Sequence, residues 1–418
     1  MTKDNSCFPR NQKLTSLKKA LRIILKKAKT INNIEAINLE NSEGRILAKN
    51  LISKINVPSY NNSAVDGFAF NFEDFKKNKG FLKKIGSSSP GKPFFKKIDS
   101  GESIEIFTGS YLISKTRKSA DTVVMKEDCE VKGSKLKIMR LPQKGANIRL
   151  MGEDIKKGKI IMKKGSKIRP VDLGFISSIG INKFSVYKKI KVGIFSSGNE
   201  LSTNNKTKQK YKIFDSNKIT LFTLLEKLHC EVIDLGIIED DYQESIKKLN
   251  YAASQVDLII TTGGVAGSES DLIVKAVNRI GELNLWKLAI KPGRPLAFGS
   301  IQGKPFFGLP GNPVSVQLLY AMLVKPLIEK LSGGNFKLPT SSKITANFSM
   351  KKKTKRMEWL RVNKETINNK NIANKFPKQG SGMISSISYS DGIIEIDENV
   401  SQVNKGDIFD FYSYESLF

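Results

Sequence analysis

The chain has 418 residues, of which 39% are hydrophobic, and a formal net charge of +30. This length exceeds what one hydrophobic core usually supports, so we expect roughly two to four domains. No apolar run approaches the roughly 18–20 residues of a membrane-spanning helix. Lysines interrupt the apolar positions after Ser16, which excludes the core of a secretory signal. We therefore expect a soluble, cytoplasmic protein with no membrane partner.

The positive charge first suggests a nucleic-acid partner. Only eleven of the 70 basic residues are arginines, and the lysines are spread along the whole chain. The densest run, Lys351 to Arg356, lacks the interleaved aromatic residues of a stacking platform. This distribution favours solvated surfaces over a localised binding stripe, so a nucleic-acid binder is the least favoured of the functions considered.

Cysteine and histidine restrict the chemistry further. Cys7, Cys129 and Cys230 have neither the number nor the spacing of a disulfide framework or a zinc cluster. The single histidine, His229, leads us to expect no Ser-His-Asp, Cys-His or multi-histidine metal site. Acid–base chemistry is then expected to depend on carboxylates, lysines or metal-bound water.

The first 190 residues predict two domains. Ser16 caps an amphipathic helix in which Leu17, Leu21, Ile24 and Ala28 recur at helical spacing. Residues 56–141 predict a β-rich inserted domain of short strands, such as 104–107 and 122–125, separated by Gly and Ser clusters. Residues 1–55 and 142–190 predict a discontinuous N-terminal helical and linker domain, with a short helix near 171–179. We expect residues 145–190 to return and pack on the N-terminal helix.

Strands and helices alternate from residue 191 to residue 333. Alternation at this spacing predicts a central doubly wound α/β domain with a parallel sheet and crossover helices. The predicted strands are 191–195, 232–235, 257–262, 285–290, 296–298 and 305–307, and the predicted helices are 216–228, 242–253, 271–280 and a long one from Pro313. From residue 334 to 418 the helical period disappears, and strands at 343–348, 357–362, 393–396 and 408–412 predict a C-terminal β domain.

Four loops of the α/β domain follow apolar strands, where open parallel sheets place ligands. They are residues 195–201, 261–265, 291–295 and 308–313, and each contains glycine. Glycine lets the backbone approach a ligand closely, and the N–H groups at helix starts favour anions. Each loop alone could be a tight turn. Four together, with Lys291 and Arg294 beside them, predict a site for an anionic, phosphate-bearing ligand.

Acidic residues form a second constellation. Carboxylates beside a phosphate site commonly hold Mg²⁺. Six of them occur in Gly-rich or turn-like segments, namely Asp66, Asp154, Glu200, Asp240, Asp241 and Asp271. The alternative is solvation at the surface, and Asp240 and Asp241 could simply start the following helix.

These segments resemble the molybdopterin molybdenumtransferase family, the MoeA proteins of bacteria and the corresponding E domain of gephyrin. Residues 58–67 resemble its Asp-Asn-Ser-Ala-Met-Asp-Gly element, 107–110 its Met-Thr-Gly-Ala, and 149–155 its Arg-Gly-Glu-Asp. Residues 214–217 resemble Tyr-Asp-Thr-Asn. Further similar segments are 236–241, 287–295, 308–315, 358–361 and 379–383. The order and spacing of these elements over more than 300 residues make the resemblance specific.

The resemblance implies an elongated four-part subunit whose α/β domain is similar to MogA, and a homodimer with the active site at the subunit interface. It implies a molybdenum insertase that takes adenylylated molybdopterin and molybdate, uses Mg²⁺ or another divalent cation, and releases AMP. In such dimers the Asp66 segment of one subunit faces the α/β domain of the other. A MogA-like protein would be a further partner.

Site roles follow from the matched positions. The implied catalytic residues are Asp66, Thr108, Asp154, Glu200 and Asp271, and the implied metal ligands are Glu200, Asp240, Asp241 and Asp271. The implied substrate-binding residues are Ser197, Gly198, Asp215, Gly263, Gly264, Lys287, Pro310, Gly311, Asn312 and Pro313. The implied molybdate-binding residues are Lys291, Arg294, Arg361 and Ser381.

Four positions depart from the family pattern. Asn61 and Asn199 stand where the family has Asp, and Ala266 and Ser268 stand where it commonly has Ser and Gly. A lost hydroxyl at residue 266 would remove a phosphate hydrogen bond worth roughly 1.5–3 kcal/mol. A molybdopterin-binding or scaffold protein with reduced turnover therefore stays open as an alternative. The related adenylyltransferase step is a second alternative, although it needs only the α/β domain.

Overall fold

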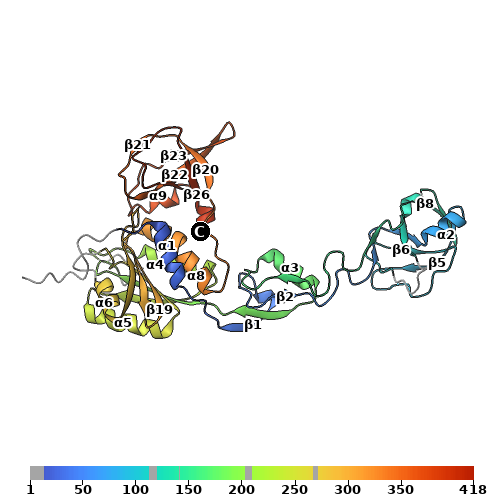
Figure 1. The fold of residues 1–418 in the computed structure, drawn as a ribbon, viewed down its shortest axis with the longest axis horizontal. Helices are drawn as coiled ribbons and strands as arrows, with labels where there is room; N and C mark the ends of the chain where they lie inside the picture. Colours follow the sequence, from blue (N-terminus) through green and yellow to red (C-terminus); the bar gives the residue numbers. More distant parts are fainter. Residues whose placement is uncertain (1–13, 113–119, 141, 203–209, 267–271) are drawn as a thin grey trace, which may run out of the picture.

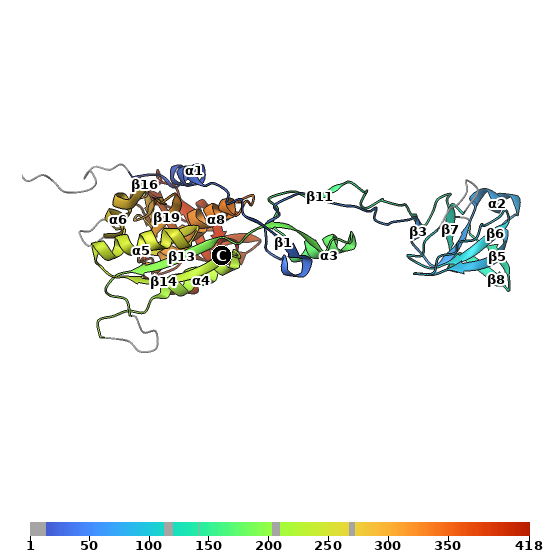
Figure 2. The ribbon, with the colours of Figure 1, turned by 90° about the horizontal axis from the view of Figure 1, so that it is seen from below.

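The computed structural model describes residues 14–112, 120–140, 142–202, 210–266 and 272–418. They form an elongated molecule with a β-rich domain at one end and the α/β and C-terminal domains together at the other (Figure 1 and Figure 2). A small connecting domain lies between these ends. This arrangement agrees with the predicted fold class, a multidomain α/β and β protein. No helix among the described residues is long and apolar enough to cross a membrane.

The N-terminal helix packs on a different domain from the one expected. Helix α1 (Leu17–Lys27) begins after Ser16, which has the extended backbone of an N-cap but makes no side-chain capping bond. Its buried residues Ala20 and Ile24 belong to the core of the α/β domain, where α1 contacts α8 (Lys325–Leu331). Apolar spacing predicted the helix correctly, but it could not say which surface the apolar face covers.

The connecting domain is built from two separate stretches of chain. Strand β1 (Ile34–Asn38) pairs with β12 (Lys183–Tyr187), and β2 (Leu51–Ile52) pairs with β11 (Ile160–Met162). Helix α3 (Pro170–Ser178) and the short helix η1 (Leu39–Asn41) complete it. Residues 145–190 therefore pair with the segment after α1, and the expectation that they pack on α1 is wrong.

The inserted domain is a six-stranded mixed sheet. Its strand order is β7-β4-β6-β5-β9-β8, in which β5 and β6 are parallel and the other neighbours antiparallel. The strands are β4 (Gly67–Phe70), β5 (Phe81–Ser88), β6 (Glu102–Ile106), β7 (Thr122–Met125), β8 (Cys129–Lys132) and β9 (Lys135–Ile138), with helices α2 (Phe72–Lys77) and η2 (Lys126–Asp128). Strand β3 (Asn62–Ser63) pairs with β10 (Ile148–Arg149) where the chain enters and leaves the domain.

The α/β domain has a six-stranded sheet covered by helices on both faces. Its order is β14-β13-β15-β19-β18-β16. The strands are β13 (Lys191–Ser197), β14 (Glu231–Ile238), β15 (Leu258–Thr262), β16 (Gly281–Trp286), β18 (Ala297–Ile301) and β19 (Lys304–Leu309). Helices α4 (Ser216–Lys227), α7 (Pro313–Leu319) and α8 share one core, and α5 (Tyr242–Gln255) and α6 (Leu272–Ile280) share the other. Neighbouring residues such as Ile259 and Ile260 face opposite cores, so the first three residues of β15, Leu258 to Ile260, are all apolar.

One of these strands, β18, runs against the predicted direction. Strands β13, β14, β15 and β19 are parallel, but β18 is antiparallel to both β19 and β16. Only Gln302 and Gly303, both with positive φ, connect β18 to β19. A two-residue connection makes a hairpin, whereas parallel neighbours need a long crossover. The prediction of a wholly parallel sheet is therefore wrong at this edge.

The predicted strand 285–290 is divided between two domains. Strand β16 ends at Trp286, and Lys287 has a left-handed φ of 65°. The chain then forms β17 (Ile290–Lys291), which pairs in parallel with β22 (Met357–Ile367) of the C-terminal domain. The long helix after Pro313 forms as predicted, but a π-helical stretch at Tyr320–Val324 separates α7 from α8.

The C-terminal domain is a closed five-stranded β-barrel. Its strands follow the cyclic order β22-β23-β20-β26-β24, because β24 also pairs with β22. They are β20 (Ser342–Ala346), β22 (Met357–Ile367), β23 (Lys370–Lys375), β24 (Gly392–Ile396) and β26 (Ile408–Ser413). The pair β21 (Met350–Lys351) and β25 (Gln402–Val403) and the helices α9 (Ser385–Ser388) and α10 (Tyr414–Leu417) complete it. Closure removes the exposed strand edges that an open sheet would present.

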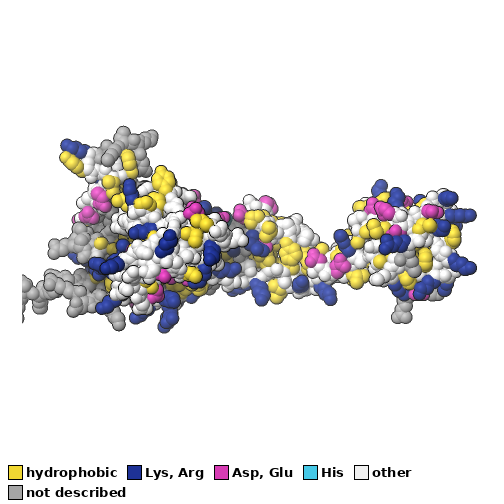
Figure 3. Space-filling view, turned by 90° about the horizontal axis from the view of Figure 1, so that it is seen from above, with side chains coloured by type: hydrophobic (Ala, Val, Ile, Leu, Met, Phe, Trp, Pro, Cys, Tyr) yellow, Lys and Arg dark blue, Asp and Glu magenta, His cyan; other side chains and the backbone are white. Residues whose placement is uncertain are grey.

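Basic side chains are dispersed over the surface. On the face shown in Figure 3, Lys and Arg occur over every part of the molecule and alternate with acidic and apolar side chains. This agrees with the prediction of solvated basic surfaces.

His229 lies where the α/β domain meets the connecting domain. It follows α4 with a left-handed φ of 57°, and its ring occupies the space that a side chain at Gly44 would need. Burial lowers the pKa of His229, and the neighbouring Lys167 lowers it further, with smaller effects from Lys189 and Arg45 and an opposing one from Glu43. This environment favours the neutral form of the imidazole.

The free energy of unfolding is expected to decrease as the pH falls through the range where His229 titrates. The unfolded chain binds this proton more readily, so the contribution of His229 is complete above about pH 6.5 and is lost towards lower pH. In His229→Asn, whose amide tolerates a left-handed backbone, this part of the pH dependence should disappear. Urea unfolding of both proteins between about pH 7.5 and 5.5 measures it, and identical slopes would contradict it.

Candidate functional site

The glycine loops meet at the carboxyl ends of the parallel strands. The N–H of Gly263 donates to Leu309 O over 2.9 Å, and that of Gly198 donates to Ile238 O over 3.4 Å. From the start of α4, Asn217 Nδ2 donates to Gly311 O over 2.7 Å. Several predicted residues therefore lie together at the carboxyl ends of the strands, which form one edge of the sheet. They are Ser197, Gly198, Gly263, Gly264 and Pro310–Pro313. Asn217 is an additional residue of this edge.

Glycine is required at two positions of this edge. Gly263 and Gly264 have φ values of 92° and 68°. A Cβ at Gly263 would overlap the Ser197 carbonyl oxygen, and one at Gly264 would overlap the Ile273 side chain. The close approach of the β13 and β15 loops therefore depends on these glycines, and it leaves the backbone as the main lining of the edge.

Asp215 has a structural role in this arrangement. Its Oδ1 accepts the Lys218 N–H over 3.0 Å as the N-cap of α4. Its Oδ2 accepts the Ser196 hydroxyl in a short hydrogen bond. Asp215 thus fixes the start of α4 against β13, next to the predicted substrate-binding residue Ser197.

The start of α7 joins the α/β domain to the barrel. Pro313 is the first residue of the helix and Asn312 occupies the N-cap position without a side-chain capping bond. The N–H of Val314 instead donates to Ser381 O over 3.2 Å. This contact places Ser381 beside the Gly311 loop.

Lys291, Arg294 and Arg361 were predicted to bind molybdate, and Lys287 was predicted to bind the substrate. Lys291 Nζ contacts Glu358 Oε1 over 2.6 Å, and the Arg294 side chain is exposed on the same loop. Lys287 Nζ lies 3.8 Å from the centre of the Trp286 ring. Arg361 is in β22, three residues after Glu358, and only 1% of it is exposed.

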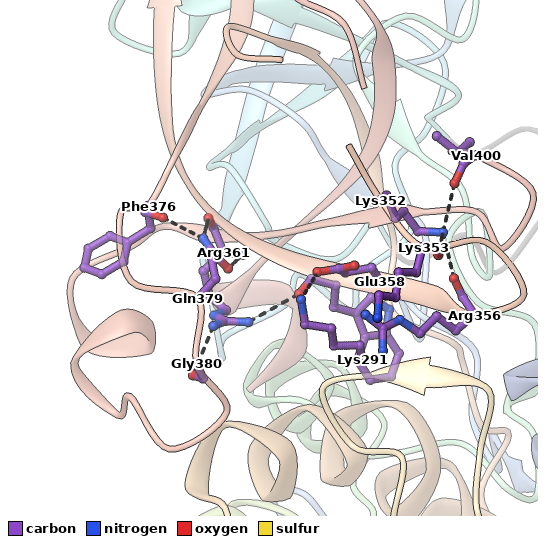
Figure 4. A network of polar contacts seen from close by, with 11 residues as sticks. Lys291, Lys352, Lys353, Arg356, Glu358, Arg361, Phe376, Gln379, Gly380 and Val400 are labelled. Atoms are coloured by element: carbon purple, nitrogen blue, oxygen red, sulfur yellow. Dashed lines mark hydrogen bonds and ion pairs between the residues drawn. The ribbon is translucent and has the colours of Figure 1, made fainter. Parts of the chain in front are cut away.

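Arg361 is held by the barrel on several sides (Figure 4). Its guanidinium donates to Ser386 Oγ and Gly380 O over 3.2 Å each, and to Trp359 O over 3.4 Å. Gln379 bridges its backbone N–H and carbonyl. Burial lowers the pKa of Arg361, and Tyr414 and Glu358 oppose this effect. Gly380 precedes Ser381, so Arg361 fixes the segment that carries Ser381.

Three of the four predicted metal ligands lie in the described chain. Glu200 is exposed after β13, and the neighbouring Asn199 exchanges side chain to backbone hydrogen bonds of 3.3 and 3.4 Å with Asp240. Asp241 accepts the Glu244 N–H over 2.6 Å as the N-cap of α5. Asp271 lies outside the described residues. Within the described residues, no three His, Cys, Asp or Glu side chains gather as a metal site.

The Asp66 cluster is the second part of the predicted site. Asp66 Oδ1 accepts both the N–H and the hydroxyl of Thr108, each over 2.7 Å. These two bonds lower the pKa of Asp66, which keeps it ionised. Asp154 lies on the adjoining segment, where its N–H donates to Val57 O over 3.2 Å. The resemblance implies catalytic roles for all three residues, and hydrogen bonds join two of them, Asp66 and Thr108.

Within one chain, the Asp66 cluster and the glycine loops do not come together. The Asp66 cluster belongs to the inserted domain, whereas the glycine loops lie at the opposite end of the molecule (Figure 1 and Figure 2).

Comparison with known proteins gives the family. Three family models cover the chain: the MoeA N-terminal region (domain I and II) at residues 15–180, a probable molybdopterin binding domain at 193–330, and the MoeA C-terminal region (domain IV) at 343–414. The molybdopterin molybdenumtransferase of Haemophilus influenzae is 40% identical over 329 residues, covering 78% of this chain and 80% of that protein. The chain belongs to the molybdopterin molybdenumtransferase (MoeA) family.

Other relatives extend the similarity over almost the whole chain. A putative molybdopterin biosynthesis protein of Methanocaldococcus jannaschii is 31% identical over 400 residues, covering 93% of this chain and 92% of that protein. A crystal structure of a MoeA protein from Pyrococcus horikoshii has a TM-score of 0.82 at 30% identity, covering 96% of this chain and 99% of that one. The predicted MoeA family and multidomain fold class are confirmed.

At two departures from the MoeA pattern, the substituted side chain accepts a backbone hydrogen bond. Asn61 Oδ1 accepts the Met151 N–H over 2.8 Å, and Asn199 Oδ1 accepts the Asp240 N–H over 3.3 Å. An Asp oxygen could accept either bond equally well. Ala266 is exposed, and Ser268 lies outside the described residues.

Sequence reasoning missed two buried charged residues of the MoeA barrel. Glu358 is 3% exposed and Lys352 is 7% exposed. Lys352 Nζ donates to the carbonyl oxygens of Lys353, Arg356, Asp397 and Val400 over 2.7 to 3.3 Å. The basic run Lys351 to Arg356 is therefore not a wholly solvated face, because Lys352 ties this loop to the loop before β25. A Lys within a basic run gives no sequence signal of burial.

Proposed function

We propose that this MoeA-family protein inserts molybdate into adenylylated molybdopterin and releases AMP. Relatives carry the name molybdopterin molybdenumtransferase. The observation that carries the proposal is the junction of the α/β domain and the barrel. There, the Val314–Ser381 contact brings the glycine loops against the segment held by Arg361. A phosphate-bearing ligand and a small dianion would therefore bind side by side.

The chain would contribute mainly binding, orientation and charge neutralisation. Backbone N–H groups of the glycine loops would hold the phosphates, as would the start of α4. Lys291, Arg294, Arg361 and Ser381 would hold molybdate, since fixed cationic and hydroxyl donors suit an oxyanion. This assignment needs no histidine, which agrees with the composition of the chain.

A divalent cation such as Mg²⁺ would neutralise charge on the adenylyl phosphate. Glu200 and Asp240 are the described candidates to hold it, because they lie on adjoining loops linked by Asn199. The capping bond of Asp241 supports a role in starting α5. We propose Asp271 as the remaining ligand, from its position in the family motif.

The separation of the two clusters favours a homodimer. The Asp66 cluster of one subunit, with Thr108 and Asp154, would face the α/β edge of the other and complete the active site. We further propose a cytoplasmic location, a MogA-like protein as supplier of the adenylylated substrate, and no membrane or nucleic-acid partner.

Molybdate-dependent AMP release from adenylylated molybdopterin in the presence of Mg²⁺ tests the proposal. The purified protein should release AMP only when molybdate is added. Asp271→Asn should reduce the rate by about 100-fold or more if Asp271 holds the metal. Absence of molybdate-dependent AMP from the wild type would refute the insertase function, and a wild-type rate in Asp271→Asn would refute the metal assignment alone.

The competing function is a molybdopterin-binding or scaffold protein with reduced turnover. The bonds that Asn61 and Asn199 make weaken this alternative, since both substitutions keep an acceptor in place. Binding of molybdopterin without any AMP release would support it.

A further inference from the structure

Glu358 is a buried carboxylate at the centre of the basic junction (Figure 4). It stands opposite Lys291 in the β17–β22 pairing, and the Met357 N–H before it donates to Ala289 O over 2.9 Å. Strand β24 pairs with β22 on the other side, where Glu358 is opposite Ile396. Its backbone is therefore fixed by both domains.

The two side chains of the Lys291–Glu358 ion pair differ in their exposure to solvent. The Glu358 side chain is 4% exposed and the Lys291 side chain is 43% exposed, with 2.6 Å between Nζ and Oε1. A buried carboxylate needs a partner to offset its desolvation. An ammonium has three donors, so the contact with Glu358 leaves two for a ligand on the exposed side. Glu358 thus limits the directions in which Lys291 can donate.

The carboxylate also acts on the two buried cations of the barrel. Burial lowers the pKa of Lys352 and of Arg361, and Glu358 is among the groups that oppose this shift in each. The same charge must repel an oxyanion that approaches Lys291 and Arg361.

We propose that Glu358 is a positioning and affinity-limiting residue of the molybdate site formed by Lys291, Arg294, Arg361 and Ser381. Its carboxylate orients Lys291 towards the oxyanion and weakens the electrostatic hold on that oxyanion, which favours turnover over tight retention. This inference rests on the proposed function of the junction.

Titration calorimetry of sodium molybdate into the full chain, combined with AMP-release kinetics, tests the inference. Glu358→Gln keeps the shape and removes the charge, so molybdate should bind more tightly by on the order of tenfold. Its kcat should fall by on the order of tenfold, because Lys291 loses its orienting partner. Glu358→Asp keeps the charge but withdraws it by one methylene, so kcat should fall while the Kd for molybdate stays close to that of the wild type.

Glu395→Gln is the matched control. Glu395 is opposite Trp359 in the neighbouring strand, and its Oε2 accepts the Trp359 Nε1–H over 3.1 Å, a bond that a Gln oxygen can also accept. Both Kd and kcat should be unchanged. A merely structural role for Glu358 would lower the unfolding temperature of Glu358→Gln without tightening the binding of molybdate.

The outcomes separate this inference from the proposed function. Unchanged or weaker molybdate binding by folded Glu358→Gln overturns the inference, and so does unchanged kcat in Glu358→Asp, which carries the test if the Gln variant does not fold. Tighter binding by Glu358→Gln in a protein whose wild type releases no AMP supports the affinity-limiting role of Glu358, overturns its role in turnover and refutes the insertase function. A wild type that does not bind molybdate overturns both.

Discussion

Replacing Arg361 with alanine is expected to abolish molybdate-dependent AMP release and to destabilise the C-terminal barrel. The change removes a side chain that is 1% exposed and leaves the acceptors on Ser386, Gly380 and Trp359 without their donor. A cavity and buried unpaired acceptors together lower the free energy of unfolding by about 2–5 kcal/mol. The segment that presents Ser381 should lose its fixed position at the same time.

A volume-matched variant separates packing from charge. Arg361→Met keeps most of the volume, so it should be more stable than Arg361→Ala but equally unable to bind molybdate. Urea unfolding followed by tryptophan fluorescence suits this comparison, because Trp359 lies in β22 and the chain has only two tryptophans. Wild-type AMP release by either variant would exclude Arg361 from the site.

The local elements were predictable because each depends on neighbours in the sequence. Strand β7 has the predicted bounds, and α4 and α5 begin at the predicted residues. The direction of each strand was harder to predict from the sequence. The apolar runs of β18 and β19 resemble those of the parallel strands, and only the short Gln302–Gly303 connection reveals a hairpin. The partner of α1 was likewise hidden, since an apolar face does not identify the surface that it covers.

The candidate site likewise has one part that the sequence predicts and another that it does not. Glycine loops at strand ends are a local pattern, so the phosphate-binding edge could be located from the sequence. The pair of Lys291 and Glu358 spans 67 positions, and it forms because β17 leaves the α/β sheet to join the barrel. Alternation in the strand 357–362 places Glu358 on the same face as Leu360 and Val362, but it does not identify the ion-pair partner of Glu358. Long-range pairs of this kind follow from domain packing, which periodicity and composition do not determine.

The position of the Asp66 cluster leads to a prediction about subunit cooperation. Asp66→Asn and Arg294→Ala should each lower AMP release by about 100-fold or more, since each removes a charge that acts on the reacting phosphate or molybdate. The amide oxygen that Asp66→Asn introduces can still accept both Thr108 bonds, and Arg294 is exposed. Both variants should therefore fold and unfold like the wild type.

A heterodimer of the two variants should regain about half of the wild-type rate. With two sites per dimer, each using Asp66 from one subunit and Arg294 from the other, one site carries both changes and its counterpart carries neither. Differently tagged subunits that are co-expressed and purified through both tags provide this species. If Asp66 and Arg294 acted within one chain, both sites would be damaged and the heterodimer would stay as inactive as its parents. Recovery of activity therefore requires an active site shared between subunits, because the elongated fold keeps the two clusters of each chain apart.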